Sequence, residues 1–156
     1  MDTHGSLVLM KHPELYDANS PIRIKMLHCG IEKAEINASF FQNKIKEALN
    51  KRQSLLETNT NSYRLIFGEN DGFPGLIADV YASVLVIKIY SEIWLPYLES
   101  ILKSLQQTSN AETVVIRLSR NIENSKLHQL KNGDVVYGTL ENEVVQFVEH
   151  GVNFSA

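Results

Sequence analysis

The residues with the clearest chemical potential are lysines and arginines in the first third of the chain. They follow one another through an expected strand and an expected helix: Arg23, Lys25, Lys44, Lys46, Lys51 and Arg52. Cations on one face of a strand, followed by a basic helix, can neutralise the phosphates of a nucleic acid. The alternative is that both are ordinary solvated faces, and the sequence leaves this alternative open.

A second, smaller group of cations lies further along the chain. Arg117 and Arg120 share the end of an expected strand, and Arg120 with Lys126 could form a small patch beside it. The candidate nucleic-acid-binding residues are therefore Arg23, Lys25, Lys44, Lys51, Arg52, Arg117, Arg120 and Lys126.

No residue pattern identifies a catalytic, cofactor or metal site. A dinucleotide or S-adenosylmethionine site needs a glycine-rich turn between a strand and a helix, whereas Gly68, Gly72 and Gly75 lead into a strand. The five histidines are scattered without metal-ligand spacing. We therefore expect no catalytic residue, no cofactor-binding residue and no metal ligand in this chain.

Several reactive or bulky side chains have simpler structural interpretations. Cys29 would need a neighbouring base to act as a nucleophile, and adjacent strand residues such as His28 point to the opposite face, so we expect a packed thiol. Glu69, Asp71 and Asp79 could gather a cation, but solvated turn carboxylates are the simpler interpretation. Trp94 and Tyr97 are expected in the core and at the rim of a helix rather than in a ligand box.

Composition indicates a globular protein. The 156 residues include 44% hydrophobic and 21% charged residues, with a single cysteine and a net charge of −3. No apolar run approaches the roughly 20 residues that span a bilayer. We expect a cytoplasmic protein without membrane contact, and the negative charge argues against an indiscriminate nucleic-acid binder.

The stretch from Tyr63 to Tyr90 organises the expected fold. It predicts strands at 64–67, 76–80 and 84–90, separated by the turn dipeptides Asp71-Gly72 and Pro74-Gly75. The continuous apolar run 84–87 predicts a strand covered on both faces. A helix opened by Ser91 and a strand at 113–118 follow. The order β-β-β-α-β predicts an α+β domain with a mainly antiparallel sheet and one packed helix.

The flanking segments predict further elements. Asn37 is a plausible N-cap for a helix that reaches Leu56, and the polar run 57–62 is typical of a linker. Short strands are expected at 7–10, 135–137 and 144–148, and the alternation at 22–27 predicts a half-buried strand with a basic outer face. Val152 and Phe154 predict a strand whose partner could lie outside the chain.

Several blocks of the chain resemble consecutive parts of one protein family. They are YDANSPIRIKMLH, AEINASFFQNKIKEALNKRQSL, YRLIFGENDGFPGLIADVYASVLVIKIY, VVIRLSRNIENSKLHQLKNGDVVYG and VVQFVEHGVNFSA. The core RL-x-x-GE-x-DG-x-PGL-x-x-D-x-Y runs from Arg64 to Tyr81. These blocks resemble the class I S-adenosylmethionine-dependent methyltransferases that modify cytosine C5 in large-subunit ribosomal RNA.

The resemblance implies a division of the chain. Residues 1–30 correspond to a partial PUA-like segment, 31–62 to a connecting helix and linker, 63–150 to a central α+β domain, and 151–156 to the start of a catalytic domain that this chain lacks. S-adenosylmethionine would then be the cofactor of the full-length family but would not bind here. Cys29 does not inherit the family's nucleophilic role. The family commonly carries Arg before Tyr81, so Val80 argues against an RNA contact at that turn.

Three hypotheses follow. The leading one is a portion of such a methyltransferase that positions ribosomal RNA and packs against a catalytic domain, inactive by itself. The second is a free-standing module that binds RNA or the ribosome through Arg23, Lys25 and the basic helix. The third is a structural homodimer formed by strand addition at open sheet edges.

Overall fold

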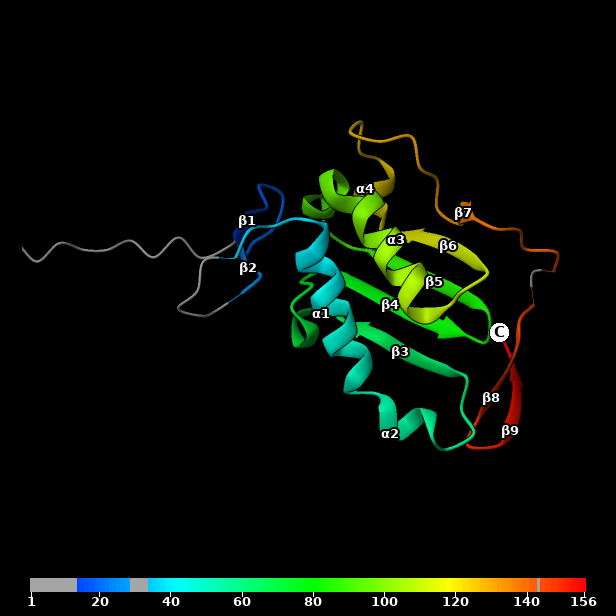
Figure 1. The fold of residues 1–156 in the computed structure, drawn as a ribbon. Coiled ribbons are helices and arrows are strands. Elements are labelled where there is room, and N and C mark those ends of the chain that lie inside the picture. Colours follow the sequence, from blue (N-terminus) through cyan, green and yellow to red (C-terminus); the bar gives the residue numbers. More distant parts are fainter. Residues whose placement is uncertain (1–13, 29–33, 143) are drawn as a thin grey trace, which may run out of the picture.

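The computed structural model of the chain describes residues 14–28, 34–142 and 144–156 (Figure 1). The expected strand at 7–10 and the expected packed thiol of Cys29 lie outside the described residues. The described chain forms a five-stranded sheet with helices on one side and a two-stranded hairpin near each end.

The central sheet is mainly antiparallel. Its strands lie in the order β3 (Ser62–Phe67), β4 (Leu76–Tyr81), β5 (Val84–Ile89), β6 (Thr113–Leu118) and β7 (Val135–Tyr137). Of its neighbouring strands, β5 and β6 are parallel and the other pairs are antiparallel. A parallel pair needs a long crossover, which the helical segment between β5 and β6 supplies. The predicted antiparallel character and the β-β-β-α-β order are confirmed.

The connection between β3 and β4 is more regular than the expected turn. Residues Gly68–Asp71 form a 3-10 helix, η1, and Gly72 closes it with a φ of 73°. This left-handed conformation strains any residue with a Cβ, and a Cβ at Gly72 would also collide with the side chain of Lys44. Glycine is therefore favoured at this corner, since any other residue would be strained and would displace the end of the Lys44 side chain.

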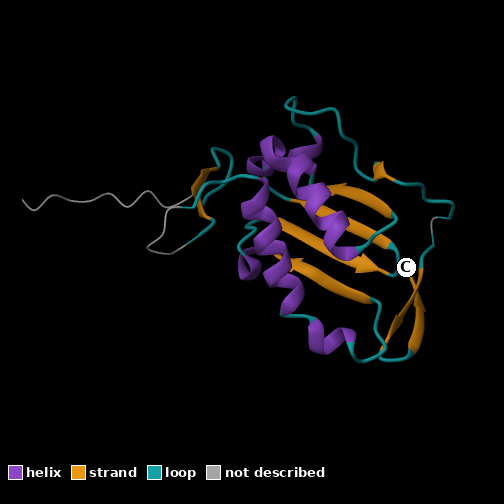
Figure 2. Ribbon diagram, viewed as in Figure 1, coloured by secondary structure: helices purple, strands orange, loops and turns teal. Residues whose placement is uncertain are grey.

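Two helices, rather than the expected one, cover the sheet. Helices α1 (Ala38–Asn50) and α3 (Leu98–Ser109) lie side by side on one face (Figure 2). The sequence predicts that the first of them only connects two units, but its buried residues Phe41, Ile45 and Ala48 join the same core. Helical spacing reveals an apolar stripe without revealing its partner, so this contact could not be read from the sequence.

The predicted first helix also ends earlier than expected. It breaks after α1, and the four-residue helix α2 (Gln53–Leu56) follows. At the break, the Arg52 N–H donates to the Leu49 carbonyl, three residues back. The expected linker then leads directly into β3.

Aromatic side chains fill the space between helices and sheet. The rings of Phe41, Phe73 and Trp94 have centroids 5.6–6.3 Å apart. Trp94 is fully buried, and its indole N–H donates to the Pro74 carbonyl over 2.8 Å. It lies in the 3-10 helix η2 (Glu92–Tyr97), which leads into α3, and Tyr97 packs half-buried at the edge. The predicted roles of Trp94 and Tyr97 as core and rim are confirmed.

The N-cap of α1 offers a direct stability test. The Asn37 side-chain oxygen accepts a hydrogen bond from the Phe40 N–H at 2.9 Å, as predicted for a cap. Replacing Asn37 by Ala should lower the free energy of unfolding by about 1 kcal/mol, because this N–H loses its partner. Asn43→Ala, an exposed site within the same helix, should be neutral or slightly stabilising. Urea denaturation of both variants checks this, and equal effects would contradict the cap's role.

The first hairpin is oriented differently from the prediction. Strands β1 (Glu14–Tyr16) and β2 (Ile24–Met26) are antiparallel. Ile22, Ile24 and Met26 are exposed, while Lys25 is half-buried and Leu27 is buried. The expected basic outer face is therefore wrong. Alternation identifies two faces of a strand, but the neighbouring structure decides which of them turns inward.

The last strand finds its partner inside the chain. Strand β9 (Val152–Ser155) pairs with β8 (Gln146–Glu149), and the Phe147 and Phe154 rings stack with centroids 5.8 Å apart. Backbone hydrogen bonds join this ribbon to residues 59–61. The expectation of an external partner is wrong, because His150 and Gly151 both adopt positive φ and form a tight hairpin turn that returns the chain onto β8.

Candidate nucleic-acid interface

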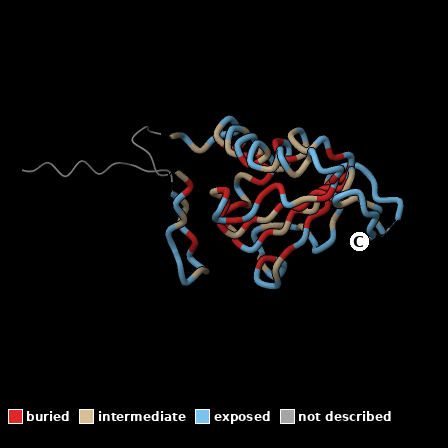
Figure 3. The backbone as a smooth tube through the Cα atoms, turned by 90° about the horizontal axis from the view of Figure 1, so that it is seen from below, coloured by how far each residue is buried: buried red, intermediate tan, exposed pale blue. Residues whose placement is uncertain are grey.

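The face of the sheet opposite α1 and α3 carries charged and aromatic side chains. On β5, Leu85, Ile87 and Ile89 are fully buried toward the helices, whereas alternation directs Val86 and Lys88 to the other side. Figure 3 shows the helical turns along one side of the sheet, with buried backbone between the layers. Val86 and Lys88 are only half-buried, whereas Val84 on the same side is buried, so the expectation that 84–87 is covered on both faces fails at Val86.

Strand register defines the residues of this open face. Arg64 lies opposite Asp79, which lies opposite Val86. The next row joins β3 to β6 through residues on all four strands: Phe67, Ile77, Lys88 and Arg117. Tyr90 follows β5 with the same alternation and is 53% exposed. We call this set the open face.

A buried carboxylate organises the cations of the open face. Asp79 is 4% exposed and accepts hydrogen bonds from Arg64 Nε at 2.7 Å and from Lys88 Nζ at 3.1 Å. The hydrogen bond to Asp79 raises the pKa of Arg64, against the smaller opposing effect of burial. The Arg64 guanidinium also lies 5.3 Å from the ring centroid of Phe67. Two cations around one carboxylate leave a positive surface.

Lys88 and Arg117 face each other across the parallel pair. They are register partners on β5 and β6, and a cavity of about 200 Å³ lies beside them, lined also by Tyr90, Ser119 and Asn132. Like charges on directly opposed residues repel each other, and the Asp79 carboxylate, which Lys88 shares with Arg64, offsets only part of this charge. An anion bound between the two side chains would relieve this repulsion. The smaller cavity is therefore suited to a phosphate.

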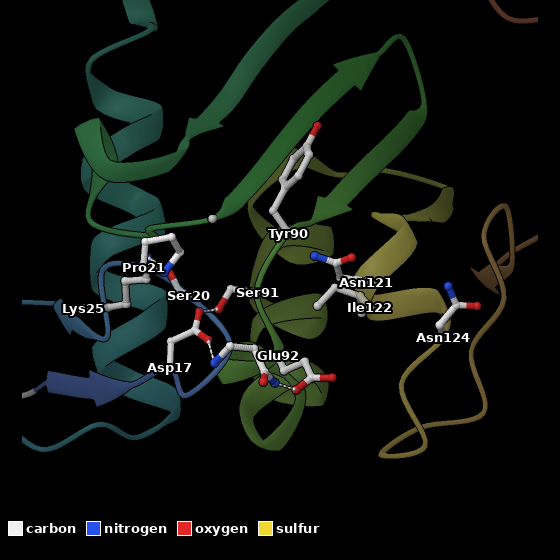
Figure 4. A pocket seen from close by; sticks show the side chains of 12 residues that line it. Asp17, Ser20, Pro21, Lys25, Tyr90, Ser91, Glu92, Asn121, Ile122 and Asn124 are labelled. Carbon is white, nitrogen blue, oxygen red and sulfur yellow. Dashed lines mark hydrogen bonds between the residues drawn. The ribbon is translucent and has the colours of Figure 1, made fainter.

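A larger cavity of about 660 Å³ adjoins the smaller one at Tyr90 (Figure 4). It lies between the loop 17–21, the strand end at 90–92 and the short helix α4 (Arg120–Glu123). On its floor, the buried Ser91 hydroxyl donates to the Asp17 carboxylate. This bond joins the first hairpin to the central sheet and fixes one wall of the cavity.

The structure separates the predicted basic cluster. Lys44 Nζ donates to the Leu27 carbonyl at 2.8 Å and lies 5.4 Å from the Phe40 ring centroid. Lys51 and Arg52 both bind the Asp71 carboxylate, with Lys51 Nζ at 3.2 Å and Arg52 Nη1 at 3.0 Å. These contacts engage Lys44 and Arg52 within the fold, whereas the Lys51 side chain is 58% exposed, and a phosphate-binding role for the three residues stays a prediction.

Asp71 binds two of these cations, Lys51 and Arg52. Its side chain is 2% exposed, and it also accepts the Phe67 N–H at 2.8 Å. Burial raises the pKa of Asp71, but the hydrogen bonds from Arg52, Phe67 and Lys51 outweigh burial and leave the pKa below its ordinary value. Asp71 is therefore a structural anion rather than the expected solvated turn carboxylate.

The remaining predicted residues lie nearer the two cavities. Lys25 lines the larger cavity, and its Nζ lies 3.1 Å from the Ser20 hydroxyl. Arg117 lines the smaller one, and Arg120 is exposed at the start of α4. Arg23 is exposed in the first hairpin, and Lys126 is exposed in the segment after α4. Lys25 and Arg117, predicted as parts of separate groups, thus line neighbouring cavities.

Sequence reasoning missed several residues of the open face. Lys88 stands in the apolar run VLVIKIY, and period-2 alternation could have placed it with Val86 and Tyr90 on one exposed side. The pairing of Arg64 with Asp79 had no signal in the sequence, because their opposition depends on a register shift between β3 and β4. Among the described residues, no group of three His, Cys, Asp or Glu side chains is placed to hold a metal ion.

Comparisons with known proteins show what the chain resembles. A ribosomal RNA large subunit methyltransferase of Deinococcus radiodurans is 38% identical over 148 residues, covering 91% of this chain and 36% of that protein. A ribosomal RNA large subunit methyltransferase I of Vibrio vulnificus is 28% identical over 141 residues, covering 90% and 35%. The chain therefore spans about a third of the length of these relatives. No family model matches the chain.

Solved structures share the fold. One is described as a SAM-dependent methyltransferase from Streptococcus mutans, with a TM-score of 0.73 and 17% identity, and the match covers 91% of this chain and 35% of that one. Another, assigned as a methyltransferase and complexed with SAH, has a TM-score of 0.65 and 19% identity, covering 80% and 30%. No helix in the described part of the chain is long and apolar enough to cross a membrane.

Proposed function

We propose that the chain is the substrate-positioning portion of a SAM-dependent methyltransferase that acts on large-subunit ribosomal RNA. The observation that carries this proposal is the 38% identity to the Deinococcus radiodurans relative along 91% of the chain. In this account the chain binds and orients RNA, and methyl transfer takes place in a part of the enzyme to which this chain does not correspond.

The open face is the proposed RNA-binding surface. It offers cations at Arg64, Lys88 and Arg117, and the exposed rings of Phe67 and Tyr90. Single-stranded RNA is commonly held by such a combination, with phosphates at the cations and bases stacked on aromatic rings. In this account the RNA contacts these residues of the sheet rather than Lys44, Lys51 and Arg52.

We further propose which atom the parent enzyme methylates and how this chain is divided into segments. By resemblance, the methylated atom is cytosine C5, and the chain comprises a partial PUA-like segment at 1–30, a connecting segment at 31–62, a central domain at 63–150 and the start of a catalytic domain at 151–156. The packing of α1 against α3 shows only that the second and third segments share one core.

Binding to ribosomal RNA tests the proposal. The purified chain is titrated with fragments of large-subunit RNA, and with unrelated RNA of equal length, at 50 and 200 mM salt. Three phosphate contacts should give a logarithmic salt slope of about −2, or roughly a 15-fold loss of affinity between these conditions. One ribosomal fragment should bind better than the unrelated control. Equal affinity for all RNAs, or no binding at 50 mM salt, contradicts the proposal.

Cofactor binding provides a second test. Calorimetry with S-adenosylmethionine should show no micromolar binding to this chain alone, because methyl transfer is assigned to another part of the enzyme. Micromolar affinity would show that a cofactor site exists in this chain. It would contradict the proposal that methyl transfer takes place in another part of the enzyme.

One observation favours a homodimer as a second candidate. Strand β9 is exposed along its length, and the apolar side chains of Val152 and Phe154 are 55% and 45% exposed. Such an edge can pair with a second copy of the chain. Sedimentation across a hundredfold range of concentration distinguishes the candidates, since a monomer at every concentration excludes strand-paired association.

A further inference from the structure

We infer that the larger cavity is a guanine-binding pocket for one unpaired nucleotide of the RNA held on the open face. This inference rests on the proposed function and deepens it by naming the base that the chain selects. It is carried by the cavity's size, by the arrangement of its polar groups and by its position next to Tyr90.

The cavity has the dimensions and walls of a nucleotide site. Its volume of about 660 Å³ lies within the range of small-molecule pockets. In Figure 4, Pro21 and Lys25 stand on one side and Asn121 stands on the other, with Ser91 and Glu92 between them. The walls come from three separate segments, so the hollow depends on the tertiary fold rather than on one loop.

Two carboxylates line the cavity, but only one is suited to a ligand. Asp17 is 6% exposed and already accepts hydrogen bonds from the Ser91 hydroxyl and from the Asn19 N–H. Glu92 is half-buried, and its Oε2 accepts a hydrogen bond from the Asn19 side-chain amide at 2.8 Å. Glu92 is therefore the acceptor that a ligand can reach.

These groups match the Watson–Crick edge of guanine. Guanine offers two adjacent donors, N1–H and the N2 amino group, which one carboxylate such as that of Glu92 can accept together. Asn121 and Asn124 add exposed side-chain amides to the wall opposite Pro21 and Lys25. Adenine would place its N1 lone pair against the Glu92 carboxylate. Because an unpaired polar group in such a site is costly, the pocket should reject adenine.

The surroundings support a nucleotide that belongs to a longer strand. Tyr90 borders both cavities, and its exposed ring can stack on a base between them. Lys88 and Arg117 beside the smaller cavity, and Lys25 beside the larger one, lie where flanking phosphates would need neutralisation. The strand would therefore run from the open face past Tyr90 into the larger cavity.

A base-substitution experiment tests the pocket. Fluorescence anisotropy compares RNA 9-mers that differ only at one central position, carrying guanine, inosine or adenine. Inosine lacks the N2 amino group, so guanine should bind about tenfold more tightly than inosine, and adenine should bind no better than inosine. In Glu92→Gln this preference should disappear while the salt slope stays unchanged. Glu99→Gln, an exposed site on α3, should retain the preference.

Two outcomes would overturn the inference: equal affinity for the three RNAs, or a guanine preference that survives in Glu92→Gln. A titration of guanosine monophosphate, followed by NMR of the Ser91, Glu92 and Asn121 amides, separates this inference from the proposed function. Shifts at these amides without any RNA binding would support the pocket and contradict the RNA-positioning function. RNA binding that leaves these amides unmoved by the mononucleotide would contradict the pocket alone.

Discussion

Replacing Asp71 by Ala should lower the free energy of unfolding by about 3–5 kcal/mol. The carboxylate is 2% exposed and holds Arg52, whose side chain is only 15% exposed, together with the Phe67 N–H. Removing it leaves a buried guanidinium without its counterion and a backbone donor without its acceptor. These groups join the segment between α1 and α2 to η1 and to the end of β3, so the loss falls at a contact between the helix layer and the sheet.

Lys51→Ala is the matched control for Asp71→Ala. Lys51 binds the same carboxylate at 3.2 Å, but its side chain is 58% exposed. Solvent screens such a pair, so its removal should cost less than about 1 kcal/mol. Urea denaturation measures both variants. If Lys51→Ala is as damaging as Asp71→Ala, the buried Arg52–Asp71 pair is not the stabilising contact.

The same carboxylate should contribute to acid unfolding. Its folded-state pKa lies below its ordinary value, so its stabilising contribution is complete above about pH 4 and is lost as the pH falls through the folded-state pKa. Asp71→Ala should therefore flatten the decline of stability below pH 4, in addition to lowering stability at neutral pH. Parallel declines in the two proteins, measured by urea unfolding at each pH, would contradict the assignment.

The double variant Lys88→Gln/Arg117→Glu should weaken binding to the preferred ribosomal RNA fragment about tenfold to hundredfold at 50 mM salt. Both cations border the smaller cavity, and a glutamate there would repel the phosphate that the pair is proposed to hold. Gln at position 88 can still donate to Asp79, which protects the fold. The salt slope should become shallower by about 1.4, as expected for two lost phosphate contacts to single-stranded RNA.

The control for this variant makes the same change in charge at two residues on the helix side of the sheet. Lys46→Gln/Lys103→Glu alters exposed residues of α1 and α3 and produces an equal change in net charge. Its RNA affinity should fall by less than about threefold, because only long-range electrostatics change. Equal losses in the two double variants would show that net charge, rather than the open face, governs binding.

Local signals in the sequence were sufficient for much of the fold. The Asn37 cap, the strands around Asp71-Gly72 and Pro74-Gly75, and the helix after Ser91 all depend on neighbouring residues, and the structure contains each of them. Contacts between distant segments were not predictable in this way. Arg52 and Asp71 are 19 residues apart, and their pairing requires α1 to lie over the corner after β3.

In the candidate site, too, local signals were predictable from the sequence and contacts between distant segments were not. Lys25 and Arg117 were identified as exposed cations by residue type alone. Lys25 is placed beside the larger cavity by the first hairpin, which the Asp17–Ser91 hydrogen bond joins to the sheet across 74 positions, and Arg117 is placed beside the smaller one by the pairing of β5 with β6. Lys88 was not predicted as a site residue, because its apolar neighbours indicated a strand buried on both faces. The outward direction of Ile24 likewise depended on what packs against the hairpin.

The most direct measurement is an NMR titration of the isotope-labelled chain with the preferred large-subunit RNA fragment, following backbone amides across the whole fold. The account predicts that the largest shifts fall on β4, β5 and β6 around Asp79, Lys88, Tyr90 and Arg117, and extend to residues 119–124. Shifts confined to α1, α3 or the first hairpin would contradict it, because RNA would then bind the opposite side of the sheet or the outlying strands.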